Sequence, residues 1–204
     1  MRTVDPDRYA ARRRNILDAA AGCFARKGFD RTTTADICST AGISSGSLFH
    51  YFPNKRAVFT AIFEQDGRDN AAQLTRAANA PDPWAALLEL VDHLVRPLTD
   101  CRNSGLVVEL IAQAGRDEEL ATLVARNDRD LREGIAALLG KAAEQGRIDP
   151  GVDAERAAHW VLGLADALFS RSGVAPDFDA LDQVPTLRLI LSRYLGAVGA
   201  TAER

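Results

Sequence analysis

Apolar residues recur at helical spacing along almost the whole chain, and this pattern limits the folds open to it. The segment from about Pro6 to Lys27 carries one apolar stripe at positions i, i+1, i+4, i+5 and i+8, formed by Ile16, Leu17, Ala20, Ala21 and Phe24. No stretch of the sequence shows sustained two-residue alternation with β-branched residues, which is the pattern of a half-buried strand. The sequence therefore predicts an all-α protein.

Capping residues and helix breakers divide this pattern into about nine helices. Gly28 is a predicted left-handed C-cap of the first helix, Thr33 and Asp36 form a capping box, and Pro81 and Pro83 mark a connection. The predicted helices cover about residues 6–27, 33–41, 45–52, 55–79, 84–98, 105–114, 117–145, 154–171 and 184–198.

Charge is distributed unevenly along the 204 residues, a length that allows one or two domains. Residues 1–60 carry 10 Lys and Arg against 5 Asp and Glu, a net charge of +5. Residues 61–204 carry 15 against 23, a net charge of −8, so the total of −3 hides a basic N-terminal part. This split indicates a module that binds a polyanion, although chance asymmetry on solvated helix faces would give the same numbers.

Cysteine usage and hydropathy exclude several classes of protein. The three cysteines, Cys23, Cys38 and Cys101, form no CxxC motif and no Cys/His pairing, and their odd number argues against a disulfide framework. The N-terminus lacks an apolar signal region, and no apolar run approaches 18 residues. We expect a cytoplasmic protein that has no membrane span, no metal site and no cofactor.

The stretch "GISSGSLFHYFPN" at residues 42–54 has the composition of a DNA-reading helix. Two short helices joined by a turn at Gly42, with helices before and after them, are the helix-turn-helix arrangement. The small residues Ser45, Gly46 and Ser47 let the backbone approach base edges, and the hydroxyls of the two serines can form hydrogen bonds with bases. Leu48 and Phe52 are predicted to face inward, four residues apart. His50 and Tyr51 would then reach phosphate oxygens, with Lys55 just past the helix end.

The segment "TTTADICSTAGISSGSLFHYFPNKRAVF" resembles the DNA-binding signature of the tetracycline-repressor (TetR) family of bacterial transcriptional regulators. The resemblance is close over about residues 10–60 and includes the "AGIS" turn and the "YFPNK" ending. It implies an N-terminal three-helix DNA-binding domain at residues 1–55, with the helix-turn-helix at about 33–52. It also implies a larger helical domain for effector binding and dimerisation at residues 56–204.

The same resemblance assigns roles to individual residues of the first domain. Ser45, Gly46 and Ser47 would contact base edges. The phosphate contacts would come from His50, Tyr51, Lys55 and the capped helix start at Thr33 and Thr34, where backbone N–H groups favour an anion. The family often has Lys, Tyr and an acidic residue at the positions of Ser45, Phe49 and Arg56. We expect Arg56 to compensate for the lost charge by contacting phosphate.

The second domain gives weaker signals. Family members commonly enclose a small-molecule effector among the fourth to eighth helices, in a pocket with apolar walls and few polar groups. Each candidate also has a plainer explanation as an ordinary core, surface or interface residue. The candidates are Phe63, Trp84, His93, Gln113, Trp160 and Asp166.

The last two predicted helices carry more apolar surface than one antiparallel pair can bury. Pairing them with the same helices of a second chain would give a two-fold homodimer. Such a dimer could place two recognition helices about 34 Å apart, the spacing of the half-sites of a palindromic operator in double-stranded DNA.

These features predict a sequence-specific transcriptional repressor that a small-molecule effector releases from its operator. Two alternatives stay open. An architectural protein would bind DNA without an effector or an operator preference, and it would lack a specificity ratio of roughly 10³ or more. An all-α enzyme is the other, but His50, His93 and His159 fall on separate helices and suggest no catalytic cluster.

Overall fold

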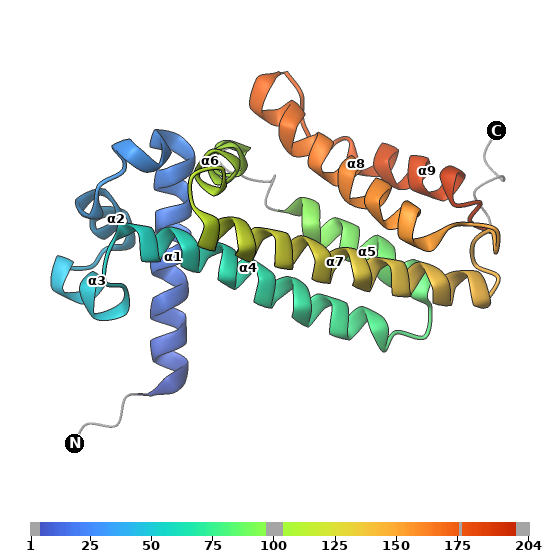
Figure 1. Ribbon diagram of the computed structural model, residues 1–204, viewed down its shortest axis with the longest axis horizontal. Helices are drawn as coiled ribbons and strands as arrows, with labels where there is room; N and C mark the ends of the chain where they lie inside the picture. The colour runs from blue at the N-terminus through green and yellow to red at the C-terminus, as the bar shows by residue number, and fades with distance from the viewer. Residues whose placement is uncertain (1–4, 97–103, 176, 199–204) are drawn as a thin grey trace. The chain divides into compact units, whose positions relative to one another are not determined.

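The computed structural model describes residues 5–96, 104–175 and 177–198, and within these ranges it contains nine α-helices and no strand (Figure 1). The all-α prediction is therefore confirmed. The helices are α1 (Pro6–Arg31), α2 (Thr34–Ala41), α3 (Ser45–Tyr51), α4 (Lys55–Ala78), α5 (Pro83–Val95), α6 (Ser104–Ala114), α7 (Glu118–Glu144), α8 (Ala154–Val174) and α9 (Val184–Tyr194).

Contacts within the chain divide it into two units. The first comprises Met1–Asp66 with Arg102–Val124, and the second comprises Gly67–Cys101 with Ala125–Arg204. The helices α4 and α7 each contribute residues to both units. The sequence predicts a boundary between a DNA-binding domain at residues 1–55 and an effector-binding and dimerisation domain at residues 56–204. This boundary separates functions and not packing units, so it stays a prediction.

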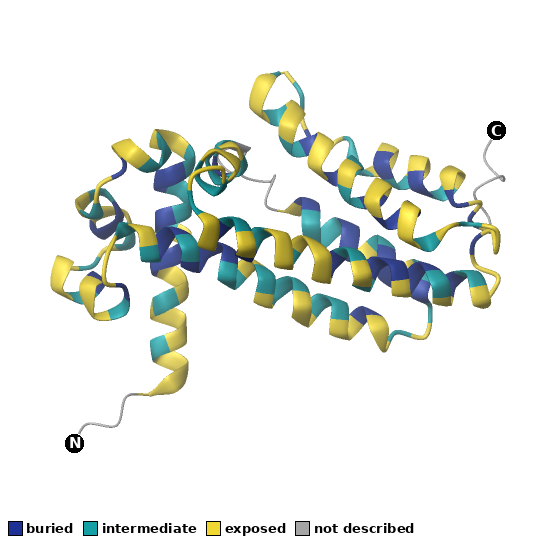
Figure 2. Ribbon diagram, in the orientation of Figure 1, coloured by how far each residue is buried: buried dark blue, intermediate teal, exposed yellow. Residues whose placement is uncertain are grey.

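The first unit is built around α1, which packs on α2 and α6. Its core holds the predicted stripe of α1 together with large side chains from the other helices, and Figure 2 shows these buried positions in dark blue. Phe24 and Phe59 meet edge to face, with ring centroids 5.0 Å apart. This apolar core fixes the short helices α2 and α3, which are too short to be stable alone.

The second unit packs α5 against α8 and α9 around a separate apolar cluster. Leu87 and Val91 of α5 are fully buried in this cluster. Asp92 of α5 accepts two hydrogen bonds from the guanidinium of Arg188 on α9. In the part of the chain that the structure describes, no helix is long and apolar enough to cross a membrane.

Several helix ends differ from the predicted ones. The predicted left-handed C-cap at Gly28 is wrong: Gly28 has φ +76° but ψ +166°, helical residues continue beyond it to Arg31, and the C-cap of α1 is Thr32. The helix α9 ends at Tyr194 rather than at Val198, because Gly196 adopts φ +60° there. The helix α8 continues to Val174, three residues beyond the predicted end at Arg171. Cys101 and the predicted end of the fifth helix at Leu98 lie outside the described residues.

Candidate nucleic-acid interface

The start of α2 is held by the predicted capping box. The amide N–H of Asp36 donates to the hydroxyl of Thr33 at 3.1 Å, and the amide N–H of Thr33 donates back to the Asp36 carboxylate at 2.9 Å. Lys27 of α1 adds an ion pair to the same carboxylate at 2.7 Å. Together these contacts lower the pKa of Asp36 to about 2, with the Lys27 hydrogen bond as the largest cause.

The turn between α2 and α3 depends on Gly42. Its backbone is left-handed, with φ +65° and ψ +40°, a conformation that costs glycine little. The amide N–H of Ile43 then donates to the carbonyl of Cys38 at 3.0 Å, which closes the helix end. Asn15 of α1 donates its side-chain amide to the carbonyl of Ala41 at 3.1 Å. The turn is thereby attached to α1.

The helix α3 buries one face and exposes the other. The hydroxyl of Ser44 accepts from the amide N–H of Ser47 at 3.2 Å, so Ser44 is the N-cap of α3. Leu48 is buried, and so is Phe52 just beyond the helix, as predicted. The predicted base-contact residues lie in the first turn, where Ser45 and Gly46 are exposed and Ser47 is half-buried.

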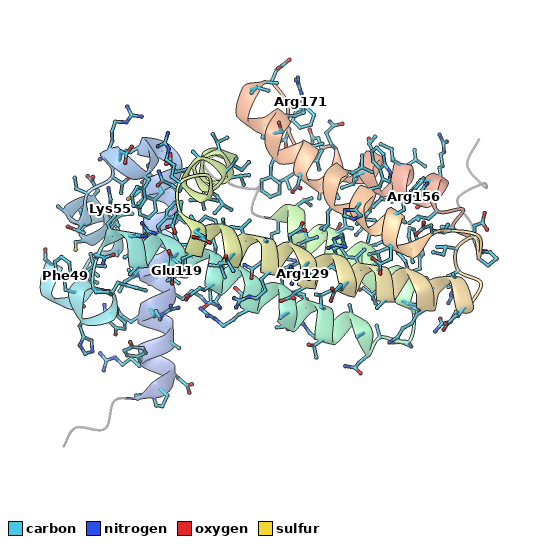
Figure 3. All side chains as sticks on the ribbon, viewed as in Figure 1. Phe49, Lys55, Glu119, Arg129, Arg156 and Arg171 are labelled. Carbon is cyan, nitrogen blue, oxygen red and sulfur yellow. The ribbon has the colours of Figure 1, made fainter. Side chains whose placement is uncertain are left out.

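The rings at the end of α3 are shared between packing and the surface. His50 is exposed, whereas Tyr51 is half-buried and packs on Tyr9 of α1 with ring centroids 4.6 Å apart. The rings of Tyr9 and His50 are nearly perpendicular, in a T-shaped arrangement with centroids 6.4 Å apart. Phe49 is 51% exposed, and Figure 3 shows it directed away from α3.

The two cations at the start of α4 are engaged with their own chain. The ammonium of Lys55 donates to backbone carbonyls at the end of α1, including that of Phe29 at 2.6 Å. The guanidinium of Arg56 forms an ion pair with Asp117, whose carboxylate also accepts from the amide N–H of Leu120 at the start of α7. More than half of the Arg56 side chain stays exposed.

All nine predicted DNA-binding residues belong to the first unit. Thr33 is exposed and Thr34 is half-buried. The amide N–H and the hydroxyl of Thr33 both donate to Asp36, so a carboxylate already occupies part of the predicted phosphate site. The assignment of these residues to base and phosphate contacts stays a prediction.

The six predicted effector-pocket residues do not belong to one unit. Phe63 is buried in the aromatic core of the first unit beside Phe59, and Gln113 of the same unit donates to Glu109. Trp84, His93, Trp160 and Asp166 belong to the second unit.

The polar members of this set have distinct surroundings. His93 bonds to Gln73 and Asn70 of α4 at 3.2 Å each, and burial is the main cause that lowers its pKa. Asp166 is exposed as a residue, yet the partial burial of its carboxyl raises its pKa, and the carboxylate of Asp128 adds to the effect. Neither observation identifies a ligand.

The second unit contains a cavity of about 250 Å³ between α4 and α7. Its walls are mostly apolar, and the ammonium of Lys141 at the lining donates to the carbonyl of Ala78 at 2.8 Å. None of the six predicted pocket residues lines this cavity. The lining residues are Leu74, Thr75, Ala78, Gly134, Ala137, Leu138 and Lys141.

Sequence reasoning missed two residues near the predicted interface. Tyr9 packs on Tyr51, and its place on the stripe that continues through Arg13 and Ile16 at helical spacing was a signal for it. Asp117 was missed as the partner of Arg56, because no local pattern relates residues so far apart in sequence.

Among the described residues, no group of three or more His, Cys, Asp or Glu side chains is placed to hold a metal ion. Cys23 and Cys38 are buried free thiols.

Comparison with known proteins agrees with this geometry. Residues 16–62 match the family model of bacterial regulatory proteins of the tetR family, and residues 83–198 match the C-terminal model of BetI-type transcriptional repressors. The chain is 26% identical to the HTH-type transcriptional regulator UidR of Escherichia coli over 175 residues, which cover 83% of each protein.

Solved structures share the fold over almost the whole chain. GusR of Salmonella enterica has 28% identity and a TM-score of 0.69, with 97% of this chain and 100% of that chain covered. FadR of Bacillus subtilis, solved in complex with stearoyl-CoA, has 19% identity and a TM-score of 0.69, with 87% and 96% covered. The helix-turn-helix geometry and these matches together show that the chain belongs to the tetR family of bacterial transcriptional regulators.

Proposed function

We propose that this protein is a homodimeric repressor that reads a palindromic operator through α3 and leaves it when a small molecule binds the C-terminal part. The observation that carries the proposal is the division of α3 into two faces. Leu48 fixes the inner face in the core, while Ser45 and Gly46 stand in solvent in the first turn. A helix held in this way can enter the major groove with its small residues toward the bases.

The phosphate contacts in this proposal surround the base-reading turn. His50 and the hydroxyl of Tyr51 lie at the end of α3, and Thr33 and Thr34 lie at the start of α2. Arg56 has several N–H groups and forms one ion pair, so it can donate to a phosphate and to Asp117 together. The net charge of +5 on residues 1–60 would attract the phosphate backbone.

Exposed apolar residues on α8 and α9 support the proposed dimer. Trp160 of α8 is 57% exposed, and Leu189, Ile190 and Tyr194 of α9 are each more than 40% exposed. Large apolar side chains gathered on two helices are typical of a protein–protein interface. A two-fold pairing of these helices would present two copies of α3 to DNA.

In this proposal, a small molecule that binds the C-terminal part regulates the affinity of the protein for its operator. FadR, which has the same fold, was solved in complex with stearoyl-CoA. Residues 83–198 of this chain match the C-terminal model of BetI-type transcriptional repressors. A ligand that favours a conformation with lower operator affinity would release the DNA. A coupling free energy of about 3 kcal/mol would weaken operator binding by roughly 150-fold. We assign DNA binding to residues 1–55, and effector binding and dimerisation to residues 56–204.

Footprinting on the DNA that flanks the gene tests this function. We expect a protected palindrome that binds roughly 10³-fold or more tightly than random duplex, with release by one compound in a screen of small metabolites. Equal affinity for operator and random duplex would instead favour an architectural protein.

Variants of α3 test the base-reading role directly. Ser47→Ala should change the preference at one base position, with about 1–3 kcal/mol of discrimination lost there. Tyr51→Phe should weaken binding to all sequences about equally, because a phosphate contact carries no sequence information. Thr122→Ala changes an exposed threonine of α7, away from the predicted DNA-binding residues and from the proposed dimer helices, and should leave both properties unchanged. An unaltered preference in Ser47→Ala would contradict the assignment of α3.

A further inference from the structure

The N-terminal part of α1 extends beyond the core of the first unit. Ile16 is the first buried residue of this helix, and Figure 2 shows the part before it mostly in yellow, the colour of exposed residues. Of residues 6–15, all of which the structure describes, only Tyr9 and Arg13 are half-buried. They are four residues apart, so they lie on the same face of α1. Something other than the core must cover this face.

The end of α3 covers it. The ring of Tyr9 packs on the ring of Tyr51 with centroids 4.6 Å apart and an interplanar angle of 33°. The guanidinium of Arg13 lies over the ring of Phe52, 5.2 Å from its centroid. The ring of His50 stands nearly perpendicular to that of Tyr51, with centroids 5.3 Å apart. Aromatic pairs attract each other at centroid separations of about 4.5–7 Å. The N-terminal part of α1 is therefore attached to the C-terminal end of α3.

We propose that Tyr9 is a positioning residue for DNA binding, and that it acts through Tyr51. Leu48 and Phe52 are buried, so the core already fixes the axis of α3. Tyr51 lies at the edge of this core and is only half-buried, whereas Tyr9 lies outside it. A partly exposed ring can exchange between staggered rotamers unless a neighbour blocks it. Tyr9 is this neighbour, and it holds the ring of Tyr51 in one orientation.

A ring that is fixed in advance binds more tightly than a mobile one. A side chain that is mobile in the free protein must become ordered on binding, and this ordering lowers affinity. The inference rests on the proposed function, in which the hydroxyl of Tyr51 contacts phosphate. Each protomer of the proposed dimer brings one Tyr51 to the operator, so the effect counts twice. Loss of the Tyr9 ring should therefore weaken operator binding by roughly tenfold.

Two variants in the full-length protein separate the ring of Tyr9 from its hydroxyl. Tyr9→Phe keeps the ring and should bind the operator like the unchanged protein. Tyr9→Ala removes the ring and should bind about tenfold more weakly. If Tyr9→Ala does not fold, Tyr9→Leu replaces it with the same expectation. An equal loss of affinity in Tyr9→Phe would make the hydroxyl of Tyr9 a direct DNA contact and overturn the proposal. Full affinity in Tyr9→Ala would overturn it as well.

A double-mutant cycle with Tyr51→Phe separates positioning from general support of α1. Tyr51→Phe removes the hydroxyl that contacts phosphate and keeps the ring that packs on Tyr9. In this background Tyr9→Ala should weaken binding by about twofold or less, because the hydroxyl that it positions is already absent. If Tyr9→Ala lowered affinity by the same factor in both backgrounds, Tyr9 would only support the fold, and the positioning role would be wrong.

A measurement without DNA separates this inference from the proposed function. Three-bond NMR couplings of Tyr51 report whether its χ1 angle stays in one rotamer. We expect one rotamer in the unchanged protein and in Tyr9→Phe, and averaged couplings in Tyr9→Ala. If the unchanged protein shows no operator preference, the proposed function fails, while the couplings still decide whether Tyr9 fixes Tyr51. If operator preference is present and Tyr51 keeps one rotamer in Tyr9→Ala, the positioning role alone fails.

Discussion

Asp36 joins two helices of the first unit through one carboxylate. It accepts from the amide N–H of Thr33 and from Lys27, and these bonds lower its pKa from 3.8 to about 2. Because the folded state holds this pKa below its usual value, the stabilisation is complete above about pH 4 and is lost as the pH falls through about 2.

The variant Asp36→Asn tests this linkage at the scale of one residue. We expect it to be less stable than the unchanged protein at neutral pH, and the difference should narrow as the pH falls from 4 toward 2. Denaturant unfolding at a series of pH values measures it. A difference in stability that stays constant across this range would show that the charge of Asp36 is not its cause.

His93 makes the stability of the fold depend on pH in a second, higher pH range. The side-chain amide of Gln73 donates to Nδ1, so Nε2–H donates to Asn70 and the ring is neutral. Burial lowers its pKa from 6.5, helped by the cations Arg96 and Arg76, while Asp69 acts in the opposite direction.

The fold thus favours the neutral imidazole of His93. Its contribution is present above about pH 6.5 and is lost as the pH falls below that value through the lower pKa of the folded state. We expect His93→Leu to remove the decline in stability that sets in as the pH falls below about 6.5. Exposed His159 offers the matched variant His159→Gln, which should keep the decline. Unfolding curves of the two variants across this range decide the point.

At the scale of elements, close packing of α6 on α1 depends on a glycine. A Cβ atom at Gly105 of α6 would collide with the backbone carbonyl oxygen of Ala25, whereas a Cβ at Gly140 of α7 would meet open space. Backbone atoms cannot move aside as the end of a side chain can. A methyl group is therefore excluded at Gly105 but would be accommodated at Gly140, although both glycines lie in α-helices.

Substitution of these glycines by alanine should change stability in opposite directions. Gly105→Ala should lower the free energy of unfolding by about 1–3 kcal/mol, because the helices must separate. Gly140→Ala should raise it by about 0.5–1 kcal/mol, since alanine loses less backbone entropy in a helix. Urea unfolding of both variants provides the measurement, and a gain in stability for Gly105→Ala would contradict the packing described here.

At the scale of the whole molecule, α9 and α6 both expose large apolar residues. Ile190 of α9 is 45% exposed and Ile111 of α6 is 70% exposed. Of these two helices, α9 belongs to the proposed dimer interface and α6 does not. The two exposed isoleucines therefore allow the same substitution to be compared inside and outside the interface. A charge at a buried apolar interface lacks a partner and opposes association.

We therefore expect Ile190→Glu to shift the protein from dimer to monomer and to weaken operator binding, because a single α3 reads only one half-site. Ile111→Glu adds the same charge and should leave the dimer intact. Sedimentation equilibrium reports the mass of each variant. A dimeric Ile190→Glu would place the interface elsewhere.

Much of this molecule could be predicted from local sequence. The capping box of Thr33 and Asp36, the left-handed turn at Gly42 and the inward side of Leu48 follow from interactions within a few residues. Such interactions are encoded in spacing and residue type, which a single sequence displays. The helix ends near Gly28 and Gly196 were less well predicted, because a glycine permits several continuations.

The sequence alone determined the helices, the capping box of α2 and the face of α3 that stays in solvent. Only the tertiary structure decided which groups these helices bring together. Lys55 meets the carbonyl of Phe29 across 26 positions, and Arg56 meets Asp117 from a different helix. Contacts of this kind depend on how helices pack and rotate against one another, and the apolar period that predicts each helix leaves that choice open.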